Sequence, residues 1–488
     1  MSFLSIFRKI IKKAAVTALI FTAVTGSIPT ASASAATDSW PDCPSIKAGS
    51  AVVMNVDTGT VLFEKEGTKK EYPASITKVM TALLALENCS SLSEDVEFTD
   101  EAINTGDNES SSIGMQIGEK LSLENALHGM LLASANEVAN AIAIHVGGSV
   151  DNFVGMMNEK ARELGCVNTH FANPCGLYNE NHYTCAYDMA LIAREAARHP
   201  DFVRIAGLKK YVIPKTNKID ETRPIANTHQ MINPAENPEY GYEYCYAGKT
   251  GYTSEAGYTL VSCAKKGSMD VVCVVMKAGC RADQYESSLK LLDHTFKRFR
   301  METSDKVTLD PAVSGSALYT RILKKDPVAV FTASGPAMLS IPKKCDFDSV
   351  ITDCTYDDSI TSVKEGANIV GTIDYIYRDH KIGQTELIYT GTQNLSLIEA
   401  TAPASQSAVE VSAEEYSAGL NTFFTNIRNF LFDSKKGIIT LLVIAAVVII
   451  FIIYDIKVLR PRRKRRKRYM MHKRLRKSSG IDKRHIRF

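Results

Sequence analysis

Two residues early in the chain have the types and spacing of a nucleophile and its base. Ser75 and Lys78 are three positions apart at the head of an apolar pattern that predicts a helix over about 76–88, so their side chains should share one face. A serine needs a base to attack a carbonyl, and a desolvated lysine can be that base. Backbone N–H groups of the first helical turn could stabilise an oxyanion. A capped helix with a solvated lysine would give the same pattern by chance.

Two further polar motifs follow, and each has an ordinary structural explanation when it is taken alone. Ser134 and Asn136 interrupt an apolar helical stretch over 121–146, where they could simply form a turn capped by Asn136. The sequence Lys-Thr-Gly at 249–251 opens a predicted strand, where it could be a turn with a solvated lysine. The three motifs together, in this order, are far more specific than any one of them.

This set of motifs resembles the set found in class A β-lactamases and penicillin-binding proteins. The chain is most similar to the serine-type D-alanyl-D-alanine carboxypeptidases, which are low-molecular-mass penicillin-binding proteins. The resemblance covers about residues 48–395. Besides the motifs, it is carried by the segments 111–119, 171–177, 182–190 and 366–389.

The resemblance implies a catalytic role for five residues. Ser75 would attack the carbonyl between the two terminal D-alanines, with Lys78 as the general base. Ser134 would relay a proton to the leaving D-alanine, and Asn136 would hold the substrate amide. Lys249 would supply positive charge near the nucleophile. The implied substrate is a peptidoglycan stem peptide that ends in D-Ala-D-Ala.

The resemblance also implies a binding role for three residues in or next to the last motif. Thr250 would bind the terminal carboxylate, next to Gly251. The N–H groups of Ser75 and Tyr252 would form the oxyanion hole. Water would then deacylate the enzyme, whereas β-lactam antibiotics, which resemble D-Ala-D-Ala, would leave a stable acyl-enzyme.

Three positions depart from the family pattern. Glu137 stands where many members have aspartate, and Cys175 where the family often has histidine. Some members have an arginine before the Lys-Thr-Gly strand that helps to hold the carboxylate, and residues 227–230 contain none. These departures bear on rate and specificity and leave the reaction class unchanged.

Three rival functions fit the sequence less well. A class A β-lactamase would have a Glu-x-x-x-Asn loop between the second and third motifs, and the sequence has none. A catalytically inactive, anchored cell-wall-binding protein would not need the intact Ser75 and Lys78. A zinc peptidase would need ligand spacings such as His-Glu-x-x-His or Cys-x-x-Cys, which are absent, so we expect no metal and no cofactor.

The pattern of strands and helices predicts an α+β fold. Helical patterns cover about 76–88, 122–146, 150–164, 186–197 and 283–299. Strands over 51–56 and 61–63 come before these helical segments, and strands over 247–252, 258–264 and 270–276 come after most of them. One sheet completed by distant segments fits this order. The resemblance specifies an antiparallel sheet flanked by helices, with a helical subdomain. Short alternating segments over 305–400 predict a small all-β domain.

The two ends of the chain predict export and anchoring. Residues 1–35 have the basic, apolar and small-residue regions of a signal peptide. An unbroken apolar run of 18 residues near the other end can span a bilayer, and the basic residues after it mark the cytoplasmic side. The predicted organisation is a signal peptide (1–35), catalytic domain (36–303), small β-rich domain (304–400), linker with amphipathic juxtamembrane helix (401–436), transmembrane helix (437–456) and basic cytoplasmic tail (457–488).

The charge of the chain is segregated between its ends and its body. The 488 residues have a formal net charge of +3, but the segment 36–456 alone has a net charge of −16. An acidic body argues against nucleic-acid binding. The signal peptide, the apolar run and the basic residues after it together predict a single-pass membrane protein, with the catalytic domain outside the cytoplasm and the tail inside.

The eleven cysteines all lie in the predicted exported part. Cys263 and Cys273 flank a predicted hairpin turn at Gly267-Ser268. That turn pairs Cys263 with Val272, which puts the two sulfurs on opposite faces and predicts no disulfide between them. Cys345 and Cys354 remain a candidate pair in the β-rich domain.

Overall fold

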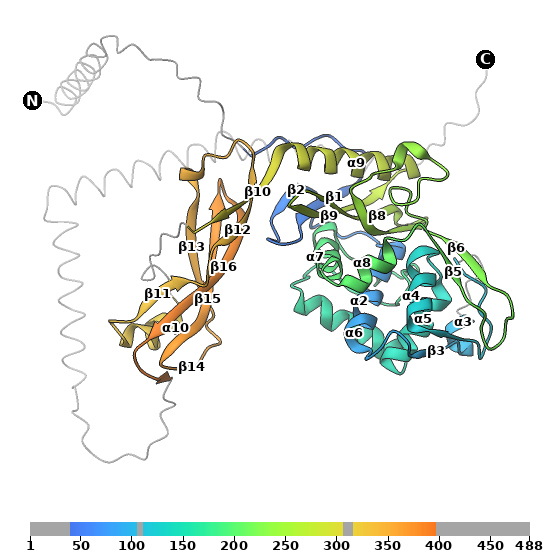
Figure 1. The fold of residues 1–488 in the computed structure, drawn as a ribbon, viewed down its shortest axis with the longest axis horizontal. Coiled ribbons are helices and arrows are strands. Elements are labelled where there is room, and N and C mark those ends of the chain that lie inside the picture. Colours follow the sequence, from blue (N-terminus) through green and yellow to red (C-terminus); the bar gives the residue numbers. More distant parts are fainter. Residues whose placement is uncertain (1–39, 105–110, 306–315, 397–488) are drawn as a thin grey trace, which may run out of the picture. The chain divides into compact units, whose positions relative to one another are not determined.

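The computed structural model of the protein describes residues 40–104, 111–305 and 316–396 (Figure 1). Within these ranges no helix has the length and the apolar character that a membrane span requires. The expected signal peptide, linker, transmembrane helix and basic tail lie outside the described residues.

A five-stranded antiparallel sheet forms the centre of the first domain. Its strand order is β2-β1-β9-β8-β7, so the N-terminal hairpin is completed by strands from about 200 residues later in the chain, as the sequence predicts. Strands β1 and β9 are almost wholly buried, because apolar clusters cover both faces of the sheet. The strands are β1 (Ser50–Asn55), β2 (Val61–Lys65), β7 (Cys245–Thr253), β8 (Gly257–Lys266) and β9 (Met269–Ala278).

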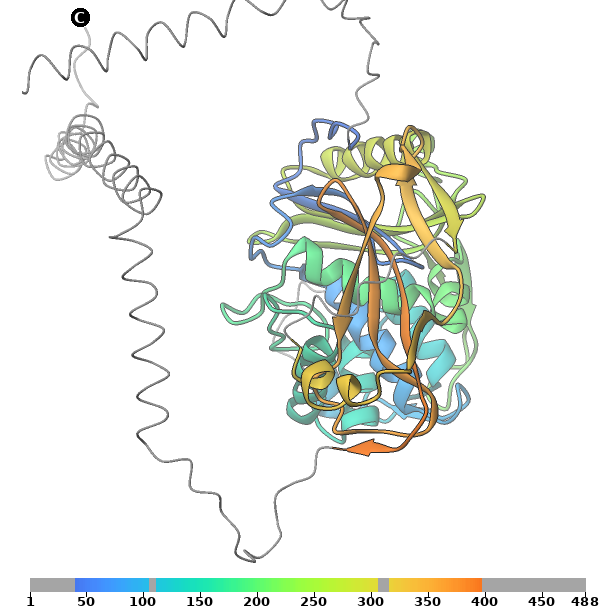
Figure 2. The same cartoon turned by 90° about the vertical axis from the view of Figure 1, so that its left-hand side faces the viewer.

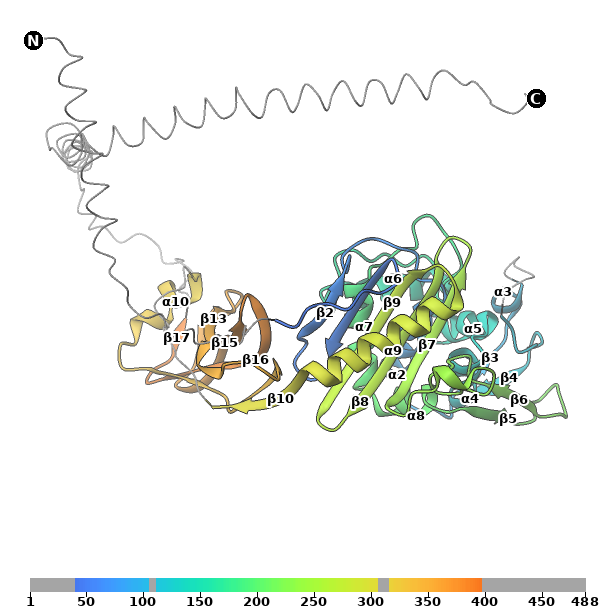
Figure 3. The ribbon, with the colours of Figure 1, turned by 90° about the horizontal axis from the view of Figure 1, so that it is seen from above.

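Helices cover the two faces of this sheet unequally. Helix α9 (Arg281–Arg298) lies across one face, which Figure 3 shows most clearly. The other face packs on a helical subdomain, with α7 against β1 and β9. The subdomain helices are α2 (Lys78–Asn88), α3 (Asp100–Ile103), α4 (Leu123–Leu132), α5 (Asn136–Gly147), α6 (Val150–Glu163), α7 (Ala186–Ala197) and α8 (Pro200–Ala206).

The longer helices lie where the periodicity predicts them, and the shorter elements were not predicted. Helix α8 has only seven residues, too few for an apolar period to show. Two small two-stranded sheets were also missed: β3 (Asp95–Glu97) with β4 (Lys120–Ser122), and β5 (Lys210–Ile213) with β6 (Arg223–Ala226).

A second sheet follows α9 and is drawn mostly in orange in Figure 2. Its first strand, β10 (Phe299–Ser304), begins directly after α9, within the range that the sequence assigned to the catalytic domain. The domain is not purely β, because α10 (Ala317–Arg321) forms a short helix in it. The remaining strands are β11 (Val330–Ala333), β12 (Ala337–Pro342), β13 (Ile351–Tyr356), β15 (Gly366–Tyr377) and β16 (His380–Gly391), with β14 (Ser362–Val363) and β17 (Leu395–Ser396) paired apart.

The pairing of β8 with β9 has the predicted register. Cys263 is opposite Val272, and Lys266 is opposite Met269. Cys263 packs in the apolar cluster on one face and Cys273 in the cluster on the other, so no disulfide joins them, as expected. The candidate pair Cys345 and Cys354 also lies within the described ranges, and its disulfide stays a prediction.

Candidate active site

Ser75 lies in a tight turn that precedes the helix. A 3₁₀ turn spans Ala74–Thr77, and α2 begins only at Lys78, so the serine is not on the α-helix that the pattern predicted. Ala74 has a φ of 52°, a left-handed conformation that non-glycine residues seldom adopt. The Thr77 hydroxyl donates to the Ala74 carbonyl at 2.8 Å and closes the turn.

Gly176 fixes the position of this turn from outside. A Cβ built on Gly176 would lie 1.9 Å from the Ala74 carbonyl oxygen, and Gly176 itself has a φ of 90°. Only a glycine can bring the two backbones this close. The segment 173–177 therefore packs directly against the turn that contains Ser75.

Lys78 is completely buried and links three parts of the site. Its Nζ lies 2.9 Å from Ser75 Oγ, 2.6 Å from Asn136 Oδ1 and 2.7 Å from the Cys175 carbonyl oxygen. Burial lowers the pKa of Lys78 to about 8, although the charges of Cys175 and Glu137 oppose that shift. A substantial neutral fraction near pH 8 is what a general base for serine requires.

The second motif lies in the break between α4 and α5. Ser134 is nearly buried and has a φ of 63°, so it is a second non-glycine residue in a left-handed conformation. Asn136 does not cap α5: Ala135 occupies the cap position, and the Asn136 side chain accepts a hydrogen bond from Lys78 instead. The ordinary reading of this motif as a capped turn is therefore wrong.

The third motif lies on the edge strand β7, against the nucleophile turn. A Cβ built on Gly251 would be 2.9 Å from the Ser75 backbone nitrogen, so glycine is needed for this approach. Lys249 is also buried, and its Nζ donates to the Thr250 carbonyl oxygen at 2.9 Å. Desolvation, followed by the nearby charge of Lys78, lowers the pKa of Lys249 well below its usual range. Tyr252, which directly follows the Lys-Thr-Gly motif, remains 57% exposed.

Two residues that the sequence analysis did not assign to the site also lie there. Thr228 is exposed, and its hydroxyl lies 2.8 Å from the Thr250 hydroxyl. His182 Nε2 contacts the Thr77 hydroxyl at 2.9 Å, and His182 Nδ1 accepts from the Ala172 N–H. Burial lowers the pKa of His182 to about 3, so this ring supports the turn as a neutral group.

The departures from the family pattern have structural roles of their own. The Glu137 carboxylate accepts from the Ser112 hydroxyl and from the Ile113 N–H, both at 2.7 Å, and so holds the 111–118 segment beside α5. At Cys175 it is the backbone carbonyl that contacts Lys78, so that contact does not depend on the side chain.

Among the described residues, Cys89, Glu94 and His145 could together hold a metal ion, because their ligand-type atoms lie within 4.8 Å of one another. Glu94 is already used in the protein: it pairs with His145 at 3.0 Å and accepts from the N–H groups of Ser90 and Ser91. No residue of the three motifs belongs to this group.

Comparison with known proteins gives one family. A family model described as D-alanyl-D-alanine carboxypeptidase matches residues 35–280. The D-alanyl-D-alanine carboxypeptidase DacF of Bacillus subtilis is 32% identical over 309 residues, which cover 61% of this chain and 76% of that protein. The match to DacC of Escherichia coli is 27% identical over 357 residues, which cover 71% of this chain and 84% of that protein.

Solved structures agree on the fold. Penicillin-binding protein 5 of Haemophilus influenzae covers 72% of this chain with a TM-score of 0.57 and 24% identity. The D-alanyl-D-alanine carboxypeptidase DacD of Francisella tularensis covers 74% with a TM-score of 0.55 and 23% identity.

Proposed function

We propose a role for each site residue of this chain, which belongs to the D-alanyl-D-alanine carboxypeptidase family. The protein is a serine-type hydrolase that removes the terminal D-alanine from stem peptides of peptidoglycan, and it is a penicillin-binding protein. The roles rest above all on one observation, the fully buried Lys78 that contacts Ser75, Asn136 and the Cys175 carbonyl together.

In acylation, the neutral form of Lys78 takes the Ser75 proton while Ser75 Oγ attacks the carbonyl carbon between the two D-alanines. The C–N bond then breaks, and the leaving D-alanine receives a proton through Ser134. The N–H groups of Ser75 and Tyr252 stabilise the oxyanion. The close approach of Gly251 to the Ser75 nitrogen supports this pairing of N–H groups.

The third motif binds the substrate's terminal carboxylate. Thr250 and Thr228 present adjacent hydroxyls, and Lys249 lies buried behind them. A bound carboxylate favours the charged form of Lys249, because an opposite charge nearby raises the pKa of an amine. Charge at Lys249 is thus coupled to the presence of substrate, while Asn136 holds the substrate amide.

Water completes the cycle by attacking the acyl-enzyme, with Lys78 again accepting a proton. A penicillin leaves a stable acyl-enzyme, because its ring-opened product stays attached to Ser75 and blocks the site. The β-lactamase alternative predicts rapid turnover of penicillin instead.

Peptide mapping tests the assignment of the nucleophile. After reaction with benzylpenicillin, trypsin digestion should yield the peptide 71–78 with the mass of the opened antibiotic added. An adduct at another peptide, for example the one that contains Ser134, would overturn the assignment. Catalytic turnover of penicillin without an adduct would favour the β-lactamase alternative.

We also propose how the domains of the chain are placed relative to the membrane. The catalytic domain (36–303) acts outside the cytoplasm after removal of residues 1–35, and the β-rich domain (304–400) is a spacer. The 401–436 segment links it to a transmembrane helix (437–456), with the tail (457–488) in the cytoplasm. The apolar run and its basic flank support this topology. Protease added to wall-stripped cells should remove the ectodomain and spare the tail. An epitope after Phe488 that is accessible without lysis would contradict it.

A further inference from the structure

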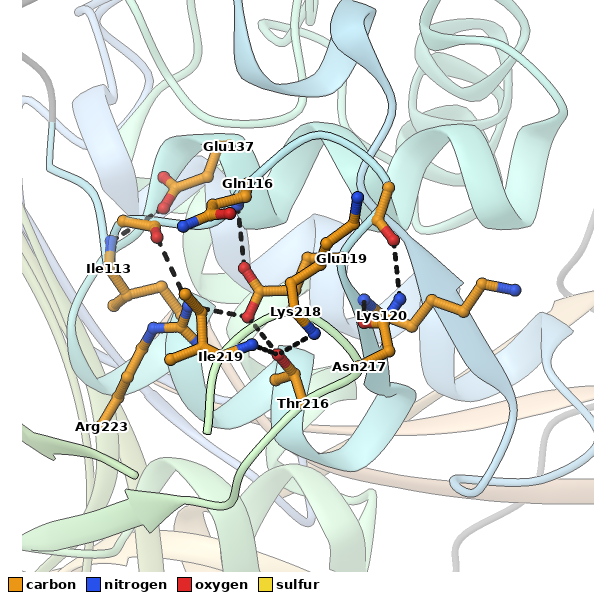
Figure 4. Close-up of polar contacts among 12 residues, drawn as sticks. Ile113, Gln116, Glu119, Lys120, Glu137, Thr216, Asn217, Lys218, Ile219 and Arg223 are labelled. Carbon is orange, nitrogen blue, oxygen red and sulfur yellow. Dashed lines mark hydrogen bonds and ion pairs between the residues drawn. The ribbon is translucent and has the colours of Figure 1, made fainter. Parts of the chain in front are cut away.

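A buried carboxylate lies beside the site without belonging to any of the three motifs. The Glu119 side chain has no exposed surface, and its Oε1 accepts from Arg223 Nη2 at 2.7 Å and from the Thr216 hydroxyl at 2.6 Å. Its Oε2 accepts from the Gln116 N–H at 2.8 Å. Figure 4 shows these groups converging on Glu119 from two separate stretches of chain.

The first of these stretches is the 111–118 segment, which contacts Asn136. At its far end, the Ser111 carbonyl accepts from the Asn136 N–H at 2.8 Å, and Glu137 holds Ser112 and Ile113. At its near end it runs directly into Glu119. The segment is therefore fastened at both ends by buried carboxylates, one of which is adjacent to a site residue.

The second stretch is the β5–β6 hairpin, which leads to Thr228. Arg223 is the first residue of β6, and β6 ends at Ala226, two residues before Thr228. Asn217, in the connection between the two strands, bonds the Gly118 carbonyl at 2.9 Å and accepts from the Lys120 N–H at 2.8 Å. Arg223 and Asn217 thus fasten the hairpin to the end of the 111–118 segment.

Removing one partner of such a pair should matter more than removing both. An arginine that is left without its carboxylate in a buried place keeps an uncompensated charge, which is strongly unfavourable. Arg223 has little alternative solvation, since its side chain is only 15% exposed and its Nη1 is buried without a hydrogen-bond partner. The ion pair therefore favours one relative placement of the two stretches.

We propose that the Glu119–Arg223 ion pair is a positioning device for the active site. It holds the 111–118 segment and the β5–β6 hairpin together, so that Asn136 stays on Lys78 and Thr228 stays beside Thr250. Neither Glu119 nor Arg223 touches the reacting atoms. The inference rests on the proposed roles of Asn136 and Thr228, and it adds the residues that place them.

The test uses the full-length protein and the variants E119Q, R223Q and E119Q/R223Q. We expect E119Q to lower the second-order rate constant of acylation by penicillin about 10- to 100-fold, in line with a misplaced site group. We expect the pH midpoint of acylation to fall by about half a unit, because a displaced Asn136 no longer accepts from the Lys78 ammonium. KM for a D-Ala-D-Ala peptide should rise, because Thr228 moves.

The double variant separates a coupled pair from general damage, and it remains informative if a single variant fails to fold. E119Q/R223Q should acylate closer to the wild-type rate than the product of the two single effects predicts. The control is E87Q, which removes the Glu87–Lys160 ion pair of 2.7 Å between α2 and α6. It should change stability alone.

Two results would overturn the proposal. One is an E119Q protein that loses stability as E87Q does but keeps the wild-type rate constant, KM and pH midpoint per folded molecule. The other is strict additivity of E119Q and R223Q in the acylation rate. If Ser75→Ala still acylates, the proposed function fails first, and that result is independent of these variants.

Discussion

The catalytic domain and the β-rich domain differ in what they bury. Around Ser75 the protein buries two lysines, Lys78 and Lys249, together with Ser134 and Asn136. The core of the β-rich domain consists of aliphatic and tyrosine side chains, and none of its fully buried residues is a lysine or an arginine among those described. Burial of an amine is energetically unfavourable, and buried titratable groups are typical of functional sites. The two buried lysines therefore distinguish the catalytic domain from the β-rich domain.

The backbone shows the same contrast. In the β-rich domain, Arg378 and Asp379 have positive φ because they form the two-residue turn between β15 and β16. Such turns require left-handed residues, so local geometry explains them. Ala74 and Ser134 belong to no hairpin, and packing by Gly176 and the α4–α5 break imposes their conformations. Unusual backbone at the site is therefore maintained by tertiary structure.

If buried groups around Ser75 serve catalysis, the largest effect of a substitution is expected at Lys78. Lys78→Met should lower acylation by a fluorescent penicillin by about 10²–10⁴-fold, because the general base is lost. The matched control is Lys160→Met, which removes a lysine that pairs with Glu87 away from the motifs. It should acylate like the wild type, with a stability change of at most about 1 kcal/mol. Equal rates for the two variants would remove the distinction between the two kinds of lysine.

Gly176 offers a test of the imposed backbone. Gly176→Ala should lower acylation by about 10²-fold, since the new Cβ must displace the Ala74 carbonyl and with it Ser75. It should also destabilise the fold by about 1–3 kcal/mol. Gly155→Ala, in α6 with no atom within 4 Å, should instead be neutral or stabilising by about 0.5–1 kcal/mol. A fully active Gly176→Ala protein would show that packing does not fix the turn.

The pH dependence of acylation should report on the buried amine. Burial lowers the pKa of Lys78 to about 8, and only the neutral form accepts a proton. The rate should therefore rise with pH and level off above about pH 8, and it should be about tenfold below the plateau at pH 7. Stopped-flow measurements from pH 6 to pH 9.5 would check this. A flat profile over that range would mean that Lys78 is not the titrating base.

The smallest effect on activity is expected in the β-rich domain. Leu339→Ala, at a completely buried position in β12, should destabilise the protein by about 2–5 kcal/mol. Acylation by the folded protein should stay within roughly twofold of wild type, because distant sites act independently. Thermal unfolding and the acylation rate of the same sample decide the matter. A tenfold slower folded variant would give this domain a direct part in catalysis.

Local patterns in the sequence predicted the central sheet, the longer helices and the β8–β9 register, because each depends on periodicity or on a two-residue turn. The 3₁₀ turn at Ser75 was not predictable, since Gly176 imposes it from about 100 residues away. Glu119 and Arg223 are likewise about 100 residues apart and belong to no motif, so only the fold brings them together. The motif residues were predicted because their spacing is specific. Thr228 was missed because it is a single threonine that belongs to no motif.

The central claim is that Ser75 is the nucleophile of a D-alanyl-D-alanine carboxypeptidase. The most direct measurement is the release of D-alanine from a peptide that ends in D-Ala-D-Ala, by the wild type, by Ser75→Ala and by Ser268→Ala, which changes an exposed turn serine. We expect Ser75→Ala to lose activity by several orders of magnitude and Ser268→Ala to match the wild type. Release of D-alanine by Ser75→Ala at the wild-type rate would contradict the account.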